Sequence, residues 1–321
     1  MKAIIPFLLL QLIWHTGEEQ IKAEPYTYEK MMLDLEEVQG MYPEVIYVGT
    51  IGQSEQGRNL PFIKIGKGDK HILLIGTHHA REWITSQFLM KLVREYAQSY
   101  KEHLRVGEYE TAILNSTAIL VIPMLNPDGV TIQQKGWLGA STSDKIKILS
   151  MNHFSMNFSR WKANALGVDL NRQYPSGWKE LKKLPAWPSY KQYRGESPAE
   201  AIEVQQLIDF TKKNKPEMAV AYHTSGKVVY WYYKNKTATI EKDFALAVQI
   251  AKKTGYDISF PEKDAVGGGY TDWFISTFHK PGFTIEMCES VEETNPPLSC
   301  LESDWEGNKE VPLMLLYEIV N

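Results

Sequence analysis

Three nearly continuous apolar runs constrain the fold of this chain more than any other feature. They lie far apart in the sequence, at residues 71–75, 118–124 and 218–222, and a shorter strand-like segment follows at 283–287. Such runs are typical of central strands that are buried on both faces of a sheet. The sequence therefore predicts a large sheet with its core on both sides.

Segments with helical spacing of apolar residues alternate with these strands. We expect helices at 26–40, 84–100, 200–214, 244–254 and 305–320. Further strands are expected at 45–48, 60–65 and 228–233. The alternation favours a single α/β domain with a mixed sheet covered by helices on both faces, and the 321-residue length fits one large domain. A long polar segment at 133–178 shows little periodicity, and ordered loops of that length tend to be functional.

Composition excludes few functions. The formal net charge of −4 and the absence of a Lys/Arg-rich run argue against a nucleic-acid partner. Cys288 and Cys300 are the two cysteines, and they could form one disulfide in an exported protein or remain buried thiols in a cytosolic one. No segment reads as a membrane span, and we expect a monomer.

Residues 1–23 are expected to be either a signal peptide or an apolar segment that stays attached. The catalytic domain is expected at 24–321. The apolar run Ala3–Trp14 is too short to cross a bilayer as a helix, but it suits the hydrophobic part of a secretory signal. Ala23 offers a small residue where cleavage could fall, although 15–22 is long and charged for a cleavage region. Export is the favoured expectation and a cytoplasmic location is the alternative.

Polar residues with catalytic potential sit at or just beyond the ends of the strand-like runs. These residues are His79, Asn126, His223 and Glu286. Because ligands gather at the carboxyl ends of strands in α/β sheets, we expect these side chains to form one site.

His79, Glu82 and His223 are the expected metal ligands. A catalytic zinc takes three protein ligands and leaves one position for water, and two histidines with one carboxylate form a known set. His79 and Glu82 are three residues apart at a strand-to-helix junction, so both can reach one ion. Taken alone, this pair is more often an exposed polar pair. Glu286, an acid inside an apolar strand, is the candidate proton acceptor for the attacking water.

The motifs together closely resemble the zinc metallocarboxypeptidases, the carboxypeptidase A-like family. The matching segments, in the family's order, are Ile51-Gly52-x-Ser54-x-x-Gly57-Arg58, Gly76-Thr77-His78-His79-Ala80-Arg81-Glu82-Trp83, Asn126-Pro127-Asp128-Gly129, Gly167-Val168-Asp169-Leu170-Asn171-Arg172, the strand ending at His223, Asp272-Trp273, and Glu286 fourteen residues after Asp272. The resemblance covers nearly the whole chain from about Tyr26. It implies an eight-stranded mixed sheet and a single Zn²⁺ per chain.

The resemblance also implies roles for individual residues. Asp169 would orient the ring of His79 from behind the metal ligands. Asn171 and Arg172 would hold the terminal carboxylate of the substrate, for which the planar fork of arginine is suited. Arg81 would line the approach for the upstream part of the substrate.

Three positions depart from the family's pattern. Lys162 falls where the family has its oxyanion-stabilising arginine, and it would serve as a point donor. Asp264 stands where digestive members have a mobile tyrosine, and Tyr270 is a nearby substitute. At the pocket position that selects the C-terminal side chain of the substrate, the A type has an aliphatic residue and the B type an acidic one. Thr271 stands at this position and is neither.

These departures, together with the segments around Tyr222–Gly226 and Gly269–Ile275, look more like the bacterial γ-D-glutamyl-diaminopimelate peptidases. The leading hypothesis is a zinc peptidase that cuts the γ-D-glutamyl-diamino acid bond of murein peptides, with Asp264 or Glu262 engaging the distal amine. The alternatives are a general metallocarboxypeptidase that releases C-terminal residues from polypeptides, and a binding protein without activity on the same fold. A murein substrate implies a secreted or wall-associated enzyme, or a cytoplasmic one that recycles wall fragments.

Overall fold

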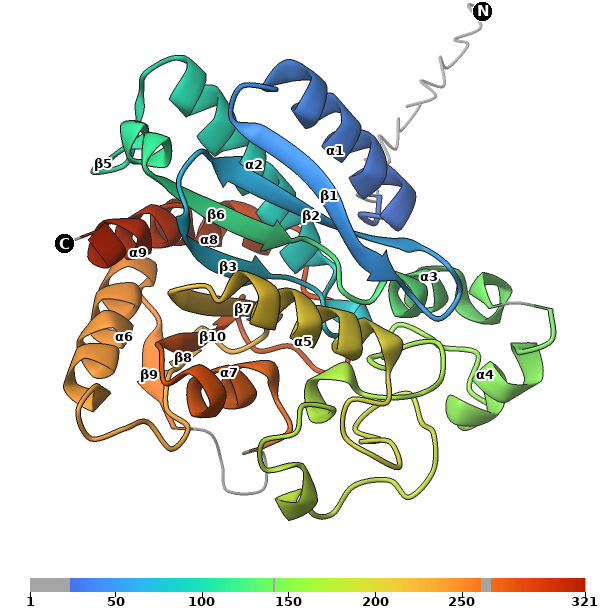
Figure 1. Ribbon diagram of the computed structural model, residues 1–321. Coiled ribbons are helices and arrows are strands. Elements are labelled where there is room, and N and C mark those ends of the chain that lie inside the picture. Colours follow the sequence, from blue (N-terminus) through green and yellow to red (C-terminus); the bar gives the residue numbers. More distant parts are fainter. Residues whose placement is uncertain (1–23, 141, 261–266, 321) are drawn as a thin grey trace, which may run out of the picture.

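The computed structural model describes residues 24–140, 142–260 and 267–320. Its main sheet has eight strands in the spatial order β1-β2-β6-β3-β7-β10-β8-β9 (Figure 1). These are β1 (Ile46–Gln53), β2 (Asn59–Gly66), β3 (Lys70–Ile75), β6 (Thr117–Ile122), β7 (Met218–Thr224), β8 (Val228–Tyr230), β9 (Asp257–Ser259) and β10 (Gly282–Met287). The central strands β6, β3, β7 and β10 run parallel, whereas the pairs β1–β2, β2–β6 and β10–β8 are antiparallel. The predicted mixed eight-stranded sheet is confirmed.

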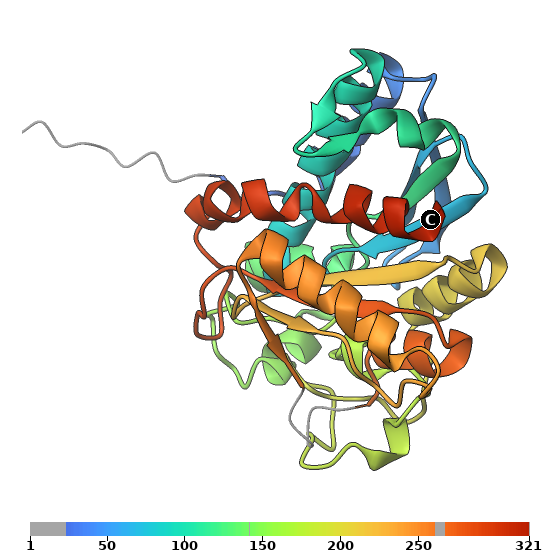
Figure 2. The ribbon, with the colours of Figure 1, turned by 90° about the vertical axis from the view of Figure 1, so that its left-hand side faces the viewer.

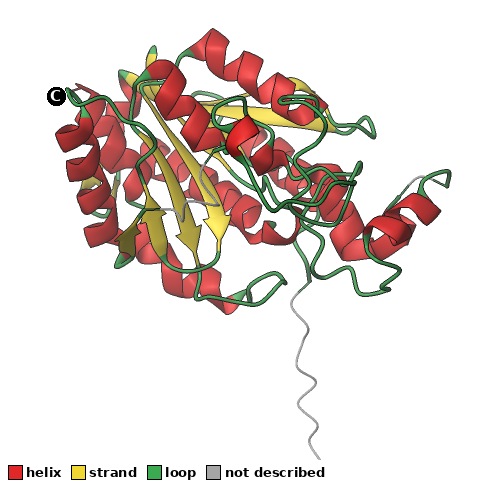
Figure 3. Ribbon diagram, turned by 90° about the horizontal axis from the view of Figure 1, so that it is seen from below, coloured by secondary structure: helices red, strands yellow, loops and turns green. Residues whose placement is uncertain are grey.

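Helices cover both faces of this sheet (Figure 3). One face packs against α1 (Tyr28–Met41), α2 (Ile84–Lys101), α6 (Ile240–Thr254), α8 (Ser299–Asn308) and α9 (Val311–Val320). The other packs against α5 (Ile202–Asn214) and α7 (Tyr270–Phe278). Figure 2 shows α6 and α9 side by side on the first of these faces. A small hairpin, β4 (Arg105–Val106) with β5 (Tyr109–Glu110), follows α2.

The alternation of side chains along the central strands explains why both faces are covered. On β3, Ile72 and Leu74 belong to the core cluster of the first face, whereas Leu73 and Ile75 belong to that of the second. Successive residues of a strand point to opposite faces, so a strand that is apolar throughout needs a hydrophobic partner layer on each side. The apolar runs in the sequence therefore dictate the layered architecture.

Several elements differ from the sequence-based expectation. The helix expected at 305–320 is instead two helices, α8 and α9. Pro312 lies in the first turn of α9, where proline is tolerated, whereas it would interrupt a single continuous helix. Three helices were not expected: α3 (Pro127–Lys135), α4 (Lys145–Met151) and α7. The strand expected at 228–233 ends at Tyr230.

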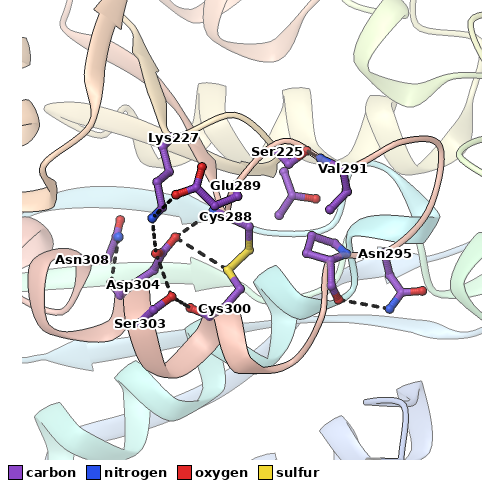
Figure 4. The surroundings of a disulfide bond; sticks show 12 residues. Ser225, Lys227, Cys288, Glu289, Val291, Asn295, Cys300, Ser303, Asp304 and Asn308 are labelled. Atoms are coloured by element: carbon purple, nitrogen blue, oxygen red, sulfur yellow. Dashed lines mark hydrogen bonds and ion pairs between the residues drawn. A yellow bond between two sulfur atoms is a disulfide. The ribbon is translucent and has the colours of Figure 1, made fainter.

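The two cysteines, whose state the sequence left open, form a disulfide in the structure. Cys288 follows β10 directly, and Cys300 lies in α8 (Figure 4). The carboxylate of Asp304 accepts a hydrogen bond from the backbone N–H of Cys288 at 2.7 Å and forms an ion pair with Lys227 at 3.6 Å. This cluster ties the segment that leaves β10 to the helical layer behind the sheet.

No helix among the described residues is long and apolar enough to cross a membrane. The segment 1–23, for which a signal peptide or apolar N-terminal segment was predicted, lies outside the described residues.

A buried ion pair connects the turn between β1 and β2 to α3. Asp128, in the first turn of α3, is fully buried, and its carboxylate accepts bonds from the guanidinium of Arg58 at 2.6 Å and from the backbone N–H of Gln56 at 2.8 Å. Removing one partner of such a pair leaves a buried charge without compensation.

We therefore expect Arg58→Met to lower the free energy of unfolding by about 3 kcal/mol, since the carboxylate of Asp128 would lose its counter-charge. Denaturation by guanidinium chloride, followed by circular dichroism, measures this change. Arg105→Met is the matched control because Arg105 pairs with Glu110 on the exposed surface and its loss should leave stability nearly unchanged. Equal stability of the two variants would contradict the prediction.

Candidate metal centre and active site

Three side chains that are distant in sequence meet at the carboxyl ends of β3 and β7. His79 precedes a short 3₁₀ turn, Ala80–Glu82, and Glu82 ends it, whereas His223 lies on β7. The carboxylate of Glu82 lies 2.8 Å from Nδ1 of His79 and 2.9 Å from Nδ1 of His223. All three residues are buried, and their donor atoms lie within 4.8 Å of one another.

The chemistry of this donor set fits a zinc ion. The two Nδ1 atoms lie 3.1 Å apart and face the same carboxylate, so a dication among them would use the lone pairs of both imidazoles. Burial alone would raise the pKa of Glu82, but His79 and His223 lower it well below its usual range, so the carboxylate stays charged. Burial lowers the pKa of His223, which favours the neutral form that binds metals.

Asp169 fixes the orientation of the His79 ring. Its Oδ1 lies 3.2 Å from Nε2 of His79, on the side of the ring away from Glu82. The same carboxylate accepts bonds from the backbone N–H groups of Asn171 and Gln192. Lys162 lies 3.9 Å away, and its charge together with that of His79 overcomes the effect of burial and lowers the pKa of Asp169 well below its usual range. A charged carboxylate behind the ring holds Nδ1 toward the metal position.

Glu286 lies beside this centre on the neighbouring strand. It is paired in register with His223 across the parallel strands β10 and β7. Burial, together with the negative charge of Glu82, raises the pKa of Glu286 to about 8. Its Oε2 has no hydrogen-bond partner among the described residues, so the side chain is available to a bound molecule.

A cavity of about 290 Å³ opens beside His79 and Glu286. Its walls combine cationic, hydroxyl and aromatic side chains: His79, Lys162, Asn171, Arg172, Tyr230, Trp231, Tyr232, Gly269, Thr271, Asp272, Ile275, Gly282, Thr284 and Glu286. A cavity that joins a cluster of metal donors to an arginine suits a small substrate with a carboxylate.

A glycine-rich turn holds the side of the cavity that Asn171 and Arg172 line. Asn171 accepts a hydrogen bond from the backbone N–H of Tyr270 at 2.9 Å, and the guanidinium of Arg172 donates to the carbonyl of Asn171. The backbone of Gly268, at φ +70°, exchanges hydrogen bonds with Tyr174 and Ser176 and lies so close to Arg172 that a Cβ would be 3.1 Å from its carbonyl oxygen. The turn therefore fixes the backbone from which Arg172 reaches the cavity.

The structure brings most of the predicted site residues together. Lys162, Asn171, Arg172 and Thr271 all line the cavity, as do His79 and Glu286. Arg81 lies outside the cavity, and its guanidinium donates to the carbonyl of Arg160 at 3.4 Å. Asp264 and Glu262 lie outside the described residues. The catalytic and binding roles of these residues stay predictions.

The structure corrects the expectation for Tyr270. Its side chain is fully buried, packs against Tyr174 and Phe274, and lies 3.2 Å from the hydroxyl of Thr211 on α5. The residue begins α7, a helix that the sequence reading missed, and the helix turns its ring into the core and away from the cavity.

The sequence reading also missed Thr284, which lines the cavity and whose hydroxyl lies 2.8 Å from that of Thr271. It lies two residues before Glu286 on β10 and therefore shares its face of the sheet. That alternation is the signal that could have identified it. Asn126, which was expected at this site because it follows a strand-like run, donates to the carbonyls of His78 and Ala163 and so links the segments that carry His79 and Lys162.

Comparisons with known proteins agree with this geometry. A model of the zinc carboxypeptidase family matches residues 31–311. The γ-D-glutamyl-L-diamino acid endopeptidase 1 of Lysinibacillus sphaericus is 34% identical over 316 residues, which cover 96% of this chain and 75% of that protein. The uncharacterized protein YqgT of Bacillus subtilis (strain 168) is 34% identical over 248 residues, which cover 74% of this chain and 63% of that protein.

Among solved structures, bovine thrombin-activatable fibrinolysis inhibitor in complex with tick carboxypeptidase inhibitor has a similar fold. The TM-score is 0.75 at 18% identity, and the match covers 92% of this chain and 98% of that chain. At this identity the likeness shows the fold.

If Glu286 moves the proton of the attacking water, Glu286→Gln should lower kcat by about 10²–10⁴-fold, since the amide cannot accept the proton. Zinc content, measured by inductively coupled plasma mass spectrometry, should remain at the wild-type level. Glu82→Gln should instead lower the zinc content because it weakens a ligand.

The matched control for both variants is Glu36→Gln, which changes an exposed glutamate on α1 and should keep full activity and zinc. Retention of full activity by Glu286→Gln would remove Glu286 from the proposed chemistry.

Proposed function

This chain belongs to the zinc carboxypeptidase family, and from that premise we propose that it hydrolyses the amide bond between a γ-D-glutamyl residue and a diamino acid in murein peptides. Membership confirms the resemblance read from the sequence motifs, and it makes the protein a zinc-dependent peptidase. The observation that carries the substrate proposal is the 34% identity, over 96% of this chain, to a protein named as a γ-D-glutamyl-L-diamino acid endopeptidase.

We assign the metal to His79, Glu82 and His223. Bound there, zinc would act as a Lewis acid and make water a better nucleophile. Glu286 lies beside these residues with an unpartnered carboxylate oxygen, so it is placed to take the proton of the attacking water and pass it to the leaving amine. Hydrolysis then leaves a carboxylate on the glutamyl side and a free amine on the diamino acid.

Lys162, Asn171 and Arg172 would hold the charges of the substrate. Lys162 lines the cavity beside His79, from where its ammonium can donate to the oxyanion that develops at the scissile carbonyl. Arg172 and Asn171 would bind the free carboxylate of the diamino acid, with the fork of the guanidinium making the bidentate contact.

The part of the cavity around α7 is polar, as a diamino acid requires. The hydroxyls of Thr271 and Thr284 lie 2.8 Å apart, and the carboxylate of Asp272 also lines the wall. Burial raises the pKa of Asp272 to about 6, and its Oδ2 accepts a bond from the backbone N–H of Gly267. These groups can accept hydrogen bonds from a distal ammonium, whereas they are poor partners for a wholly apolar side chain.

A murein substrate and the Cys288–Cys300 disulfide together favour an exported or wall-associated enzyme. Disulfides persist mainly in oxidising surroundings outside the cytoplasm. A cytoplasmic enzyme that recycles wall fragments is the alternative location.

The proposed activity predicts that the purified protein releases meso-diaminopimelate from L-Ala-γ-D-Glu-meso-diaminopimelate, and that a zinc chelator abolishes the release. Mass spectrometry of the products measures both effects. Ordinary peptides that end in Phe, Leu, Lys or Arg should be cleaved far more slowly under the same conditions. If only these ordinary peptides are trimmed, the protein is a general metallocarboxypeptidase and the murein proposal is wrong.

Because this wall of the cavity is polar, we expect Thr271→Ile to change the substrate preference. Isoleucine removes the hydroxyl that faces Thr284 and adds apolar volume, so kcat/KM for a peptide ending in Leu should rise about tenfold relative to kcat/KM for the murein peptide. Steady-state kinetics on the two substrates give this ratio. Thr237→Ile, on the exposed surface, is the control. An unchanged ratio in Thr271→Ile would mean that this wall does not select the substrate.

A further inference from the structure

Glu203 is a fully buried acid that the proposed chemistry does not use. It lies in the first turn of α5, and its side chain is shielded from solvent. Two hydrogen bonds from other described residues reach its carboxylate, and both are long. The side-chain amide of Asn164 donates at 3.3 Å and the backbone N–H of Glu55 at 3.5 Å. No lysine or arginine of the described residues forms an ion pair with it, so a charge at this position would be poorly compensated.

A second buried acid lies beside Glu203. The backbone N–H of Glu55, in the turn between β1 and β2, points to the carboxylate of Glu203. That of the next residue, Gln56, donates to the carboxylate of Asp128 at 2.8 Å. Asp128 has a counter-charge, because the guanidinium of Arg58 lies 2.6 Å from it. Two neighbouring carboxylates repel each other when both are charged, so the acid without a cation is the one that keeps its proton.

The electrostatics agree with these contacts. Burial is the main cause that raises the pKa of Glu203, to about 7. The charges of Asp128 and Glu55 raise it further, whereas the amide of Asn164 and the residue's own backbone N–H oppose the shift. The phenol of Tyr174 also lies near, but burial raises its pKa well above the usual range, so it adds no charge. Glu203 is therefore mostly neutral in mildly acidic solution.

Asn164 connects Glu203 to a tight turn at residues 164–168. The side-chain oxygen of Asn164 accepts hydrogen bonds from the backbone N–H groups of Leu166 and Val168, both at 3.0 Å. Its backbone N–H donates to the carbonyl of Val168 at 2.9 Å. The residue that closes this turn is thus the one whose amide contacts the buried acid.

We propose that Glu203 is a pH-sensitive clamp that, as a neutral acid, holds the turn 164–168 against the turn between β1 and β2 and loosens this contact when it ionises. An ionised carboxylate is stabilised by water, so openings of the structure that hydrate it become more frequent. Lys162 lies two residues before the turn 164–168, and Asp169 directly follows it. The clamp therefore acts on the segment that positions two of the predicted site residues.

The direction of the pH effect follows from the order in which the folded and unfolded states lose the proton. The ordinary pKa of 4.5 applies to Glu203 in the unfolded chain, whereas its pKa in the folded protein is about 7. Between these values the folded protein keeps a proton that the unfolded chain has lost. The contribution of Glu203 to stability is thus complete below the unfolded pKa, falls as the pH rises, and levels off above the folded pKa.

The first test is urea denaturation of the zinc-loaded protein at pH 5 and pH 8, with zinc in fixed excess. The unfolding equilibrium constant of the wild type should rise between these pH values at least about tenfold more than that of Glu203→Gln, since the amide has no proton to lose. The readout is the change with pH and not the absolute stability, because glutamine alters the hydrogen bonds at this position. Glu36→Gln, at an exposed position of α1, is the matched control and should keep the wild-type change.

Hydrogen–deuterium exchange locates the effect in the structure. After correction for the intrinsic dependence of exchange on pH, protection of the amides of Leu166 and Val168 should fall at least about tenfold from pH 5 to pH 8 in the wild type. It should stay constant in Glu203→Gln. Glu203→Met, which also carries no proton at this position, repeats both comparisons if the glutamine variant does not fold.

Two results would overturn the clamp. Constant protection of these two amides in the wild type would show, without any variant, that the turn 164–168 does not respond to pH. An equal change of stability with pH in the wild type and in Glu203→Gln would show that Glu203 does not titrate in this range.

Discussion

Two buried carboxylates and a third, partly buried one lie within one small region of the molecule, and the site depends on the groups that compensate their charges. The carboxylate of Glu82 contacts the rings of both histidines. The carboxylate of Asp169 lies near His79 and Lys162 and accepts a hydrogen bond from a backbone N–H group. Glu286 keeps an unpartnered oxygen and a raised pKa. An isolated buried carboxylate is expensive, so this concentration of negative charge is stable only with cations beside it. If zinc binds at His79, Glu82 and His223, as we propose, its charge would contribute to the electrostatic balance of the core as well as to the chemistry.

The backbone around these charges is held by hydrogen bonds that need particular residues. Asn126 caps α3 by accepting from Gly129, and it also donates to the carbonyls of His78 and Ala163. Gly268 allows a close approach behind Arg172. These contacts connect the loops that follow β3 and β6 with the segment carrying Lys162 and Arg172. A long segment of little periodicity can therefore hold Lys162 and Arg172 in fixed positions, because such contacts anchor it to the neighbouring loops.

The sequence predicted the parts of the fold that depend on apolar patterning. The runs at 71–75 and 218–222 are β3 and β7, and the residues that follow them form the candidate metal centre. Patterning failed where a short helix replaces a loop, as in α3 and α7. Tyr270 shows the consequence: its nearness in sequence to Asp264, where digestive members have a mobile tyrosine, suggested a substrate contact, but the start of α7 turns its ring into the core. Tertiary contacts, such as the pairing of Thr271 with Thr284, leave no periodic signal in the sequence.

The two cations that line the cavity lie in different surroundings. Lys162 is 3.9 Å from the buried carboxylate of Asp169, whereas the guanidinium of Arg172 donates to the carbonyl of Asn171. A substrate whose free carboxylate binds Arg172 while its scissile carbonyl lies near Lys162 would place negative charge beside both cations, so the charges of substrate and site would be complementary.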